Sequence, residues 1–131
     1  MIILTIKTSE RIDFVDITDK VASKVEASGI LNGIVNVFVP HTTCGITINE
    51  NADPDVVKDM KMQLSKIVPK ESNFRHFEGN SDSHIKTSMY GSSEIIFIEK
   101  GIPILGTWQG LFLCEFDGPR TRKVYLKIME N

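Results

Sequence analysis

Short segments in which apolar and polar residues alternate constrain the fold of this chain more than any other feature. Residues 2–7 and 122–129 both show this period of two, which is typical of a strand with one buried face. Further strands are predicted at residues 11–15, 34–39, 44–48, 94–98 and 106–116. The pattern therefore predicts a sheet made of several short strands.

Two segments with helical spacing interrupt these strands. In the first, Ile17, Val21 and Val25 recur every four residues, Thr18 can cap the helix, and Gly29 can end it. The second begins with Asp53 as N-cap, Pro54 at the first helical position and Asp55 as an acid in the first turn. Its buried stripe is predicted to consist of Val56 or Val57, Met60, Leu64 and Ile67, before Pro69 ends the helix. The order of elements predicts an α+β fold, a mainly antiparallel sheet covered by two helices.

The segment between the second helix and the last strands is predicted to be a loop. Residues 70–90 are polar and aperiodic, with at most one helical turn after His84. A loop of this length is unusual in a compact domain, and long ordered loops often carry function.

Composition narrows the classes of protein that fit. The chain has 131 residues, 41% of them hydrophobic, which suits one globular domain covering residues 1–131. A net charge of −2 argues against a nucleic-acid coat. No apolar run approaches the roughly 18 residues that span a membrane. Only two cysteines and no secretory leader predict a cytoplasmic protein with free thiols, one that binds neither nucleic acid nor membrane.

A first polar patch lies at residues 40–53, between two predicted strands. It holds His41 and the candidate substrate- or anion-binding residues Thr42, Thr43, Cys44, Asn49, Asn51 and Asp53. The patch ends at a predicted helix start, whose free N–H groups attract anions. For Cys44 and Asp53 alone, a buried thiol and a helix cap are the commoner roles. For His41, beside two threonines, a functional role is favoured.

A second polar patch lies at residues 73–86. It carries His76, Glu78, Asp82, His84 and Lys86. Imidazoles with carboxylates between them can bind a divalent cation or share acid–base work. The spacing matches no standard zinc motif, and a single loop histidine is commonly just solvated. Because all three histidines of the chain fall in these two patches, we expect them to share one site.

A third patch lies at residues 105–123, where two glycines flank Trp108 and Gln109. Glycine inside a strand often marks a close approach of backbone or ligand. Glu115 is an acid within an apolar run and needs a partner, either Arg120, Arg122 or a metal. A structural ion pair and a ligand role remain equally open for Glu115. The arginines can also hold a phosphate.

Three segments together resemble the secondary thiamine-phosphate synthase family. They are residues 41–54, 78–86 and 106–110, and the resemblance covers nearly the whole chain. It implies a compact domain with a barrel-like mixed sheet, assembled as a homotrimer. It also implies a transferase that joins hydroxymethylpyrimidine diphosphate to thiazole phosphate as a secondary activity. The motif histidines of the family fall on His41, His76 and His84.

The sequence thus predicts a pocket for a small phosphorylated substrate. The candidate catalytic residues are His41, His76, His84, Asp82 and Glu115, and the three histidines are also candidate ligands of a divalent metal, zinc or magnesium. Further substrate contacts are expected from Lys86, Trp108, Gln109, Arg120 and Arg122. Two alternatives stay open: a metal-dependent hydrolase of a small phosphorylated or amide substrate, and a non-catalytic trimeric module that binds a ligand or metal.

Overall fold

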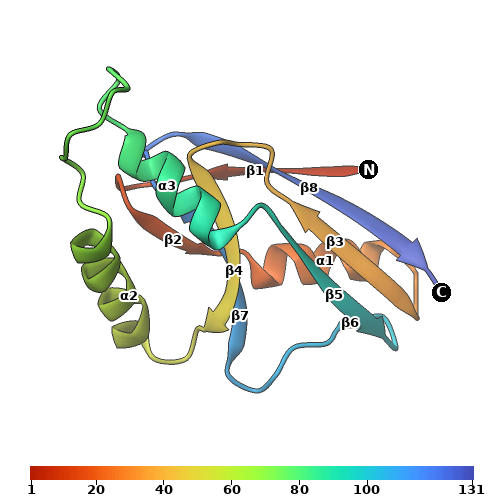
Figure 1. Cartoon of the computed structure of the whole chain (residues 1–131). Coiled ribbons are helices and arrows are strands. Elements are labelled where there is room, and N and C mark those ends of the chain that lie inside the picture. The colour runs from red at the N-terminus through yellow and green to blue at the C-terminus, as the bar shows by residue number, and fades with distance from the viewer.

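Eight short strands form two antiparallel sheets in the computed structural model, which describes residues 1–131 (Figure 1). The strands are β1 (Ile2–Lys7), β2 (Asp13–Asp16), β3 (Gly33–Phe38), β4 (Cys44–Glu50), β5 (Ser93–Glu99), β6 (Ile102–Pro103), β7 (Gln109–Glu115) and β8 (Thr121–Glu130). The helices are α1 (Thr18–Ser28), α2 (Pro54–Ile67) and α3 (Ser81–Tyr90). One sheet has the order β1-β8-β3-β5-β6 and the other β2-β7-β4, and together they curl into a half-barrel. The predicted α+β class with a barrel-like sheet is confirmed.

The main core lies between the five-stranded sheet, the second sheet and α1. β8 pairs with β1 on one side and with β3 on the other, which places Leu4 opposite Val124 and Val35 opposite Ile128. The inward side chains of these strands pack against α1, whose Val21 and Val25 are fully buried. The alternation along the sequence therefore separates an inner face from an outer face of this sheet.

β7 separates two cores because its side chains alternate between them. Leu111 and Leu113 point into the main core. Phe112 and Cys114 point the other way, into a smaller core that Leu64 of α2 also enters. Both faces of this strand are buried, which explains its nearly continuous apolar run.

The first helix begins with a different cap from the predicted one. Thr18 is the first residue of α1, and the carboxylate of Asp16 accepts a hydrogen bond from its N–H group at 3.0 Å. The Thr18 hydroxyl instead accepts the Leu111 N–H at 2.9 Å, which ties α1 to β7. The predicted stop is confirmed, since Gly29 closes the helix with a positive φ of 73°.

The second helix matches its predicted start. The Asp53 carboxylate accepts the Asp55 N–H at 2.9 Å, and Pro54 occupies the first helical turn. The far end differs, because Ile67 is exposed and Val68, the residue after it, is buried instead. The apolar stripe therefore ends one residue later than its spacing indicated.

The third helix was not predicted, because α3 has an inverted pattern of polarity. Its buried residues are Asp82, Ser83, Lys86 and Thr87. Its exposed side carries Ile85 and Met89. A helix that buries polar residues has no apolar stripe for periodicity to detect, so the predicted loop at residues 70–90 is wrong from residue 81 onward. The sheet is accompanied by three helices rather than two.

None of the three helices combines the length and the apolar character needed to cross a membrane.

Candidate functional site

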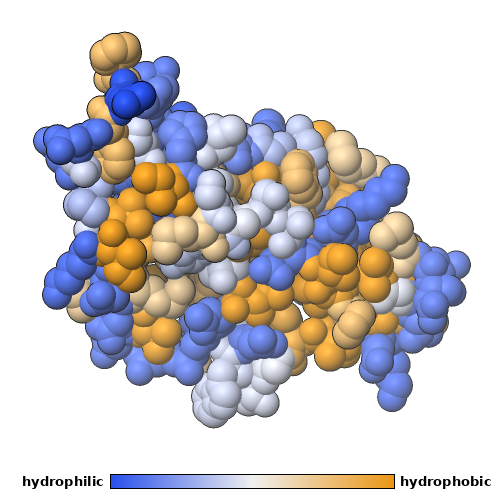
Figure 2. Space-filling model, viewed as in Figure 1, coloured by the Kyte–Doolittle hydropathy of each residue, from blue (hydrophilic) through white to orange (hydrophobic).

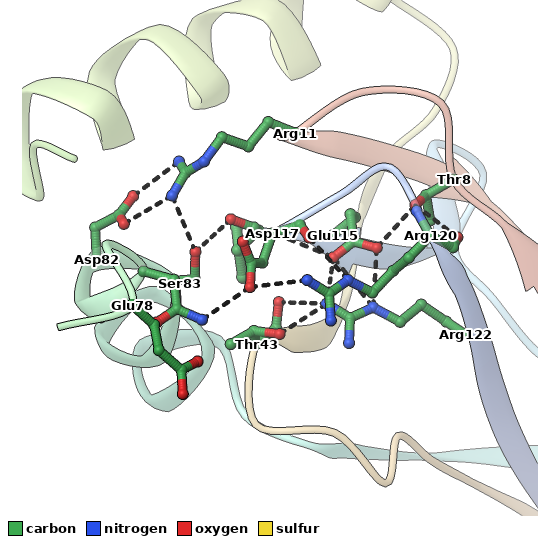
Figure 3. Close-up of polar contacts among 12 residues, drawn as sticks. Thr8, Arg11, Thr43, Glu78, Asp82, Ser83, Glu115, Asp117, Arg120 and Arg122 are labelled. Atoms are coloured by element: carbon green, nitrogen blue, oxygen red, sulfur yellow. Dashed lines mark hydrogen bonds and ion pairs between the residues drawn. The ribbon is translucent and has the colours of Figure 1, made fainter. Parts of the chain in front are cut away.

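A buried ion pair joins the ends of β7 and β8 (Figure 3). The Arg122 guanidinium donates to the Glu115 carboxylate, with Nε 2.9 Å from Oε1, and both side chains are buried. Thr8 donates its hydroxyl to the same carboxylate at 2.8 Å. Burial alone would raise the pKa of Glu115, but the hydrogen bonds from Arg122 and Thr8 hold it below its ordinary value. Glu115 is thus fully engaged within the protein.

Arg122 is satisfied in the same way. Its second nitrogen donates to the carbonyl and the hydroxyl of Thr43, at 3.1 and 2.8 Å. Thr43 is buried, so its hydroxyl is turned inward. Arg122 and Thr43 are thus both buried, and they bind each other and Glu115.

A second buried network fixes the inner side of α3. Arg11 donates two hydrogen bonds from its guanidinium nitrogens to the carboxylate of Asp82, at 2.9 and 3.1 Å (Figure 3). Lys86, one turn further along α3, donates to the same carboxylate at 2.9 Å. Burial would raise the pKa of Asp82, but the hydrogen bonds from Arg11 and Lys86 lower it. Asp82 and Lys86 are both buried, and they hold the helix rather than reach a ligand.

The β7–β8 turn joins this region through Asp117. Its carboxylate accepts hydrogen bonds from Asn80 at 2.9 Å and from Arg120 at 3.1 Å. Arg120 is therefore paired, although about half of its side chain is exposed.

His41 lies in the loop that follows β3, three residues after the last strand residue, Phe38. Its Nε2 accepts the backbone N–H of Lys123 on β8 at 2.9 Å. Burial and the charge of Arg122 lower the pKa of His41. With Nε2 as acceptor, the neutral ring carries its proton on Nδ1. Nε2 is thus not free to bind a metal while this hydrogen bond holds.

His76 and His84 come together beside the start of α3. Their ring centroids are 5.6 Å apart and the rings are perpendicular, at 89°. The Nε2 of His76 is 3.7 Å from the Glu78 carboxylate. Two adjoining hollows surround the pair, one of about 330 Å³, and their linings combine Lys70, Glu71, Ser72, Phe74, Arg75, His76, Glu78, Gly79, Ser81, His84 and Ile85. We call this region the His76–His84 cleft.

The cleft contains the N-terminus of α3. Asn80 precedes the helix, and its amide nitrogen donates to Asp117, but its side chain makes no cap hydrogen bond to the helix. The first N–H groups of α3 therefore have no side-chain acceptor, and the helix dipole adds partial positive charge there. Inside the same turn, Asp82 faces two cations, Arg11 and Lys86, so this cluster has a net positive charge.

The segment around Trp108 is a tight turn rather than the start of a strand. The Gln109 side chain accepts the Gly106 N–H at 2.7 Å, and Gln109 N–H returns to the Gly106 carbonyl at 3.1 Å. The predicted strand from residue 106 therefore begins only at residue 109. A Cβ on Gly110 would lie 2.4 Å from the Asn51 side chain, so only glycine fits. Trp108 itself remains 64% exposed.

The remaining candidates in the first patch are held in local structure. Asn51 donates its side-chain amide to Asp16 at 3.0 Å, and the side-chain Oδ1 of Asn49 accepts the Glu50 N–H at 2.8 Å. Thr42 is exposed in the loop that follows β3. Burial raises the pKa of Cys44 to about 12, so this thiol is not a nucleophile at neutral pH.

The structure therefore divides the expected site. It brings His76 and His84 together, whereas His41, in the loop between β3 and β4, makes a separate contact with the backbone of β8. No group of three or more His, Cys, Asp or Glu side chains is arranged to hold a metal ion. The sequence reasoning did not single out Thr8, Arg11, Asn80 or Asp117. Arg11 and Asp82 lie 71 residues apart, and no local pattern links them.

Comparison with known proteins identifies the family. A family model described as UPF0047 protein YjbQ-like matches residues 2–131. The chain belongs to this family. It is 55% identical to UPF0047 protein MJ1081 of Methanocaldococcus jannaschii, over 95% of this chain and 90% of that one. It is 50% identical to UPF0047 protein YugU of Bacillus subtilis, over 96% of both chains.

Solved structures agree with this assignment. A crystal structure of an uncharacterised YjbQ/UPF0047 protein from Clostridium acetobutylicum has a TM-score of 0.96 and 53% identity, and covers 98% of this chain and all of that one. A YbjQ-like protein of unknown function from Sulfolobus solfataricus has a TM-score of 0.94 at 31% identity, covering 99% of this chain and 96% of that one. The fold described above is therefore the fold of this family.

These relatives correct two predictions. The assignment to the secondary thiamine-phosphate synthase family is wrong, because the matching family model and the curated relatives are UPF0047 proteins. The prediction that the protein synthesises thiamine phosphate is therefore also wrong, since none of these relatives is described as such a synthase. The two alternatives, a hydrolase and a non-catalytic module, gain no support from these names.

Proposed function

We propose that the His76–His84 cleft binds a small phosphorylated molecule. The observation that carries the proposal is the meeting of two imidazoles with an uncapped helix start in one hollow of the surface. Backbone N–H groups at a helix start and the helix dipole both favour an anion. Imidazole N–H groups can donate further hydrogen bonds to the oxygens of a phosphate bound there.

The charges around the cleft support an anionic ligand. Lys70 and Arg75 line it from the loop before α3, where Glu71 and Glu78 also line it, so the formal charges of the loop balance. The network behind the helix start adds positive charge, because Arg11 and Lys86 share one carboxylate, Asp82. A phosphate placed at the helix start would therefore meet positive potential from the helix and from the network behind it.

The cleft also offers an apolar surface beside the polar one. Phe74 lies in both hollows, and Ile85 lines the one that contains His84. A ligand with a phosphate at one end and a ring or short chain at the other would use both surfaces. We therefore expect a phosphorylated organic molecule to bind more tightly than inorganic phosphate.

We further propose that a divalent cation, zinc or magnesium, binds here together with the ligand. His76, His84 and Glu78 supply nitrogen and carboxylate donors of the type that zinc prefers. These donors do not form a complete site by themselves. Phosphate oxygens would complete the coordination, so the ion and the ligand should bind cooperatively.

Calorimetric titration with inorganic pyrophosphate and with phenyl phosphate tests the proposal. Each is titrated alone and with Mg²⁺ or Zn²⁺. We expect H76A and H84A to weaken binding by at least about tenfold, which equals roughly 1.4 kcal/mol. H41A is the matched control, because it removes the third imidazole of the chain at a place outside the cleft. Equal affinities in the native protein and both cleft variants would overturn the proposal.

We also propose a cytoplasmic location and assembly as a homotrimer. The location is supported by Cys44 and Cys114, which are both free and buried. Assembly is supported by large apolar side chains that one copy leaves exposed on a sheet face. Measurement of the mass in solution tests the number of copies.

A further inference from the structure

A hollow of about 410 Å³ lies between the end of α1 and the hairpin of β5 and β6. Its walls are Ala22 and Glu26 of α1, residues 29–31 after the helix, and residues 100–103 of the hairpin. Figure 1 shows this hairpin at the opposite end of the molecule from α3 and the loop before it. The volume falls within the roughly 300 to 1,000 Å³ of small-molecule sites. We call this region the α1–β6 hollow.

Backbone hydrogen bonds hold the walls of the hollow in place. The Gly101 N–H donates to the Leu31 carbonyl at 2.9 Å, which ties the hairpin to the segment after α1. The Gly29 N–H donates to the Glu26 carbonyl at 3.1 Å and closes the helix. A ligand would therefore enter a site whose backbone is already ordered, and this favours binding.

Much of the lining is apolar and open to solvent. Leu31 and Ile102 are 61% and 62% exposed, and Ile30 and Pro103 lie beside them in the same lining. Figure 2 shows hydrophobic side chains gathered over β5 and β6, with hydrophilic ones at the end of that hairpin. A short branched hydrocarbon chain would be removed from water on such a surface.

The lining also holds one acid and one base, Glu26 and Lys100. Both are exposed, and none of the ion pairs of the chain includes either of them. The C-terminus of α1 adds partial negative charge beside Glu26, and no basic residue lies in its last turn. A ligand with a cationic group and an anionic group would thus find a partner for each.

Lys100 adopts a conformation that its residue type does not favour. Its φ is 53°, and that of Gly101 is 78°, while Glu99 and Ile102 pair on either side of them. A two-residue hairpin turn with two positive φ angles prefers Asn followed by Gly. The stability of the turn therefore favours asparagine over lysine at this position. We attribute the lysine to its ammonium group, which the turn presents at the edge of the hollow.

We propose that the α1–β6 hollow binds a free amino acid with a branched aliphatic side chain, such as leucine. The ammonium group of the ligand lies between Glu26 and the C-terminus of α1. Its carboxylate pairs with Lys100, and its side chain covers Leu31 and Ile102. The hollow shares no residue with the His76–His84 cleft, so this ligand binds independently of the proposed phosphorylated one.

NMR titration of isotope-labelled protein with L-leucine tests the inference. We expect the amide signals of Gly29, Leu31 and Gly101 to shift and saturate, with a Kd of about 1 mM or lower. Isocaproate lacks the ammonium group and leucinamide lacks the carboxylate, so each should bind about three- to fivefold more weakly. Glycine lacks the side chain and should bind at least about tenfold more weakly. Absence of saturable shifts with L-leucine, or equal binding of any one of these analogues, would overturn the inference.

Two variants locate the charged contacts. K100N removes the ammonium group and gives the turn the residue that its conformation favours, so the urea midpoint should equal or exceed that of the native protein. E26Q removes the carboxylate and keeps the length of the side chain. Each should weaken L-leucine binding about three- to fivefold. The matched control is K24Q, because Lys24 is exposed on α1 outside the hollow.

We expect K24Q to bind L-leucine as the native protein does. Unchanged binding in both K100N and E26Q would overturn the inference, and so would a loss in K24Q as large as in E26Q. Binding of phenyl phosphate should be the same in K100N as in the native protein, because Lys100 lies outside the His76–His84 cleft. The two proposed sites are therefore tested separately.

Discussion

The two sides of α3 differ in whether their polar groups have partners within the chain. On the inner side, Asp82 and Lys86 are buried and every charge has a partner within the chain. On the outer side, His84 faces His76 across an open cleft, and no side chain of the protein caps the helix start. Sequence places these residues within one polar segment. Their surroundings give one side a structural role and leave the other available to a ligand.

The largest effect is expected from breaking the fully buried pair. E115A leaves the Arg122 guanidinium buried without its carboxylate, and removing one partner of such a pair costs about 3 to 5 kcal/mol. Urea denaturation measures the free energy of unfolding. The double variant E115A/R122M should recover much of this loss, because it removes both charges. Equal stability of the single and double variants would show that the pair is not what holds β7 to β8.

A smaller loss is expected from D82N. It removes the negative charge that balances Lys86 and Arg11, but Arg11 is partly exposed and can turn to water. We expect a loss of about 2 kcal/mol in the free energy of unfolding, below that of the buried pair. The control S88A lies on the outer side of the same helix. A loss in S88A as large as in D82N would remove the distinction between the two sides.

Acid should weaken both buried networks, that of Glu115 and that of Asp82, in a defined pH range. The pKa of Glu115 and that of Asp82 are lower in the folded protein than their ordinary values of 4.5 and 3.8. Their contribution to stability is therefore complete above about pH 4.5 and is lost as the pH falls through the lower folded values. Urea midpoints from pH 7 to pH 3 should drop steeply for the native protein and less steeply for E115Q.

His41 should respond at a higher pH. Its folded pKa lies below the ordinary 6.5, so the unfolded chain binds the additional proton and stability falls as the pH drops below about 6.5. H41N should cost about 1 kcal/mol at pH 7, because the Lys123 N–H loses its acceptor. Between pH 7 and pH 5 the variant should lose less further stability than the native protein does. An identical decline in the stability of both proteins would show that protonation of His41 does not cause the loss between pH 7 and pH 5.

The smallest effect on stability is expected in the cleft. H76A should change the free energy of unfolding by less than about 0.5 kcal/mol, because this imidazole is half exposed. Its effect on ligand binding should be large, as proposed above. A substitution that leaves stability intact and abolishes binding is what separates the outer side of α3 from the inner side.

Local signals in the sequence predicted much of the fold. Strand alternation separated the inner and outer faces, and Asp53 with Pro54 located the start of α2. These succeed because strands and caps depend on neighbours close in sequence. α3 was missed because a buried Asp82 is stable only beside Arg11, 71 residues earlier. Pairing over such distances has no local pattern, which also explains why the grouping of the histidines could not be fixed in advance.

The turn around Trp108 has a consequence for local unfolding. Gln109 closes the turn, Asn51 packs on Gly110 and bonds to Asp16, and Asp16 caps the helix that Thr18 begins. Three segments distant in the sequence thus share one chain of contacts. They should open as a single cooperative unit in native-state hydrogen exchange. The amides of Thr18, Asn51 and Gln109 should then exchange with similar opening free energies.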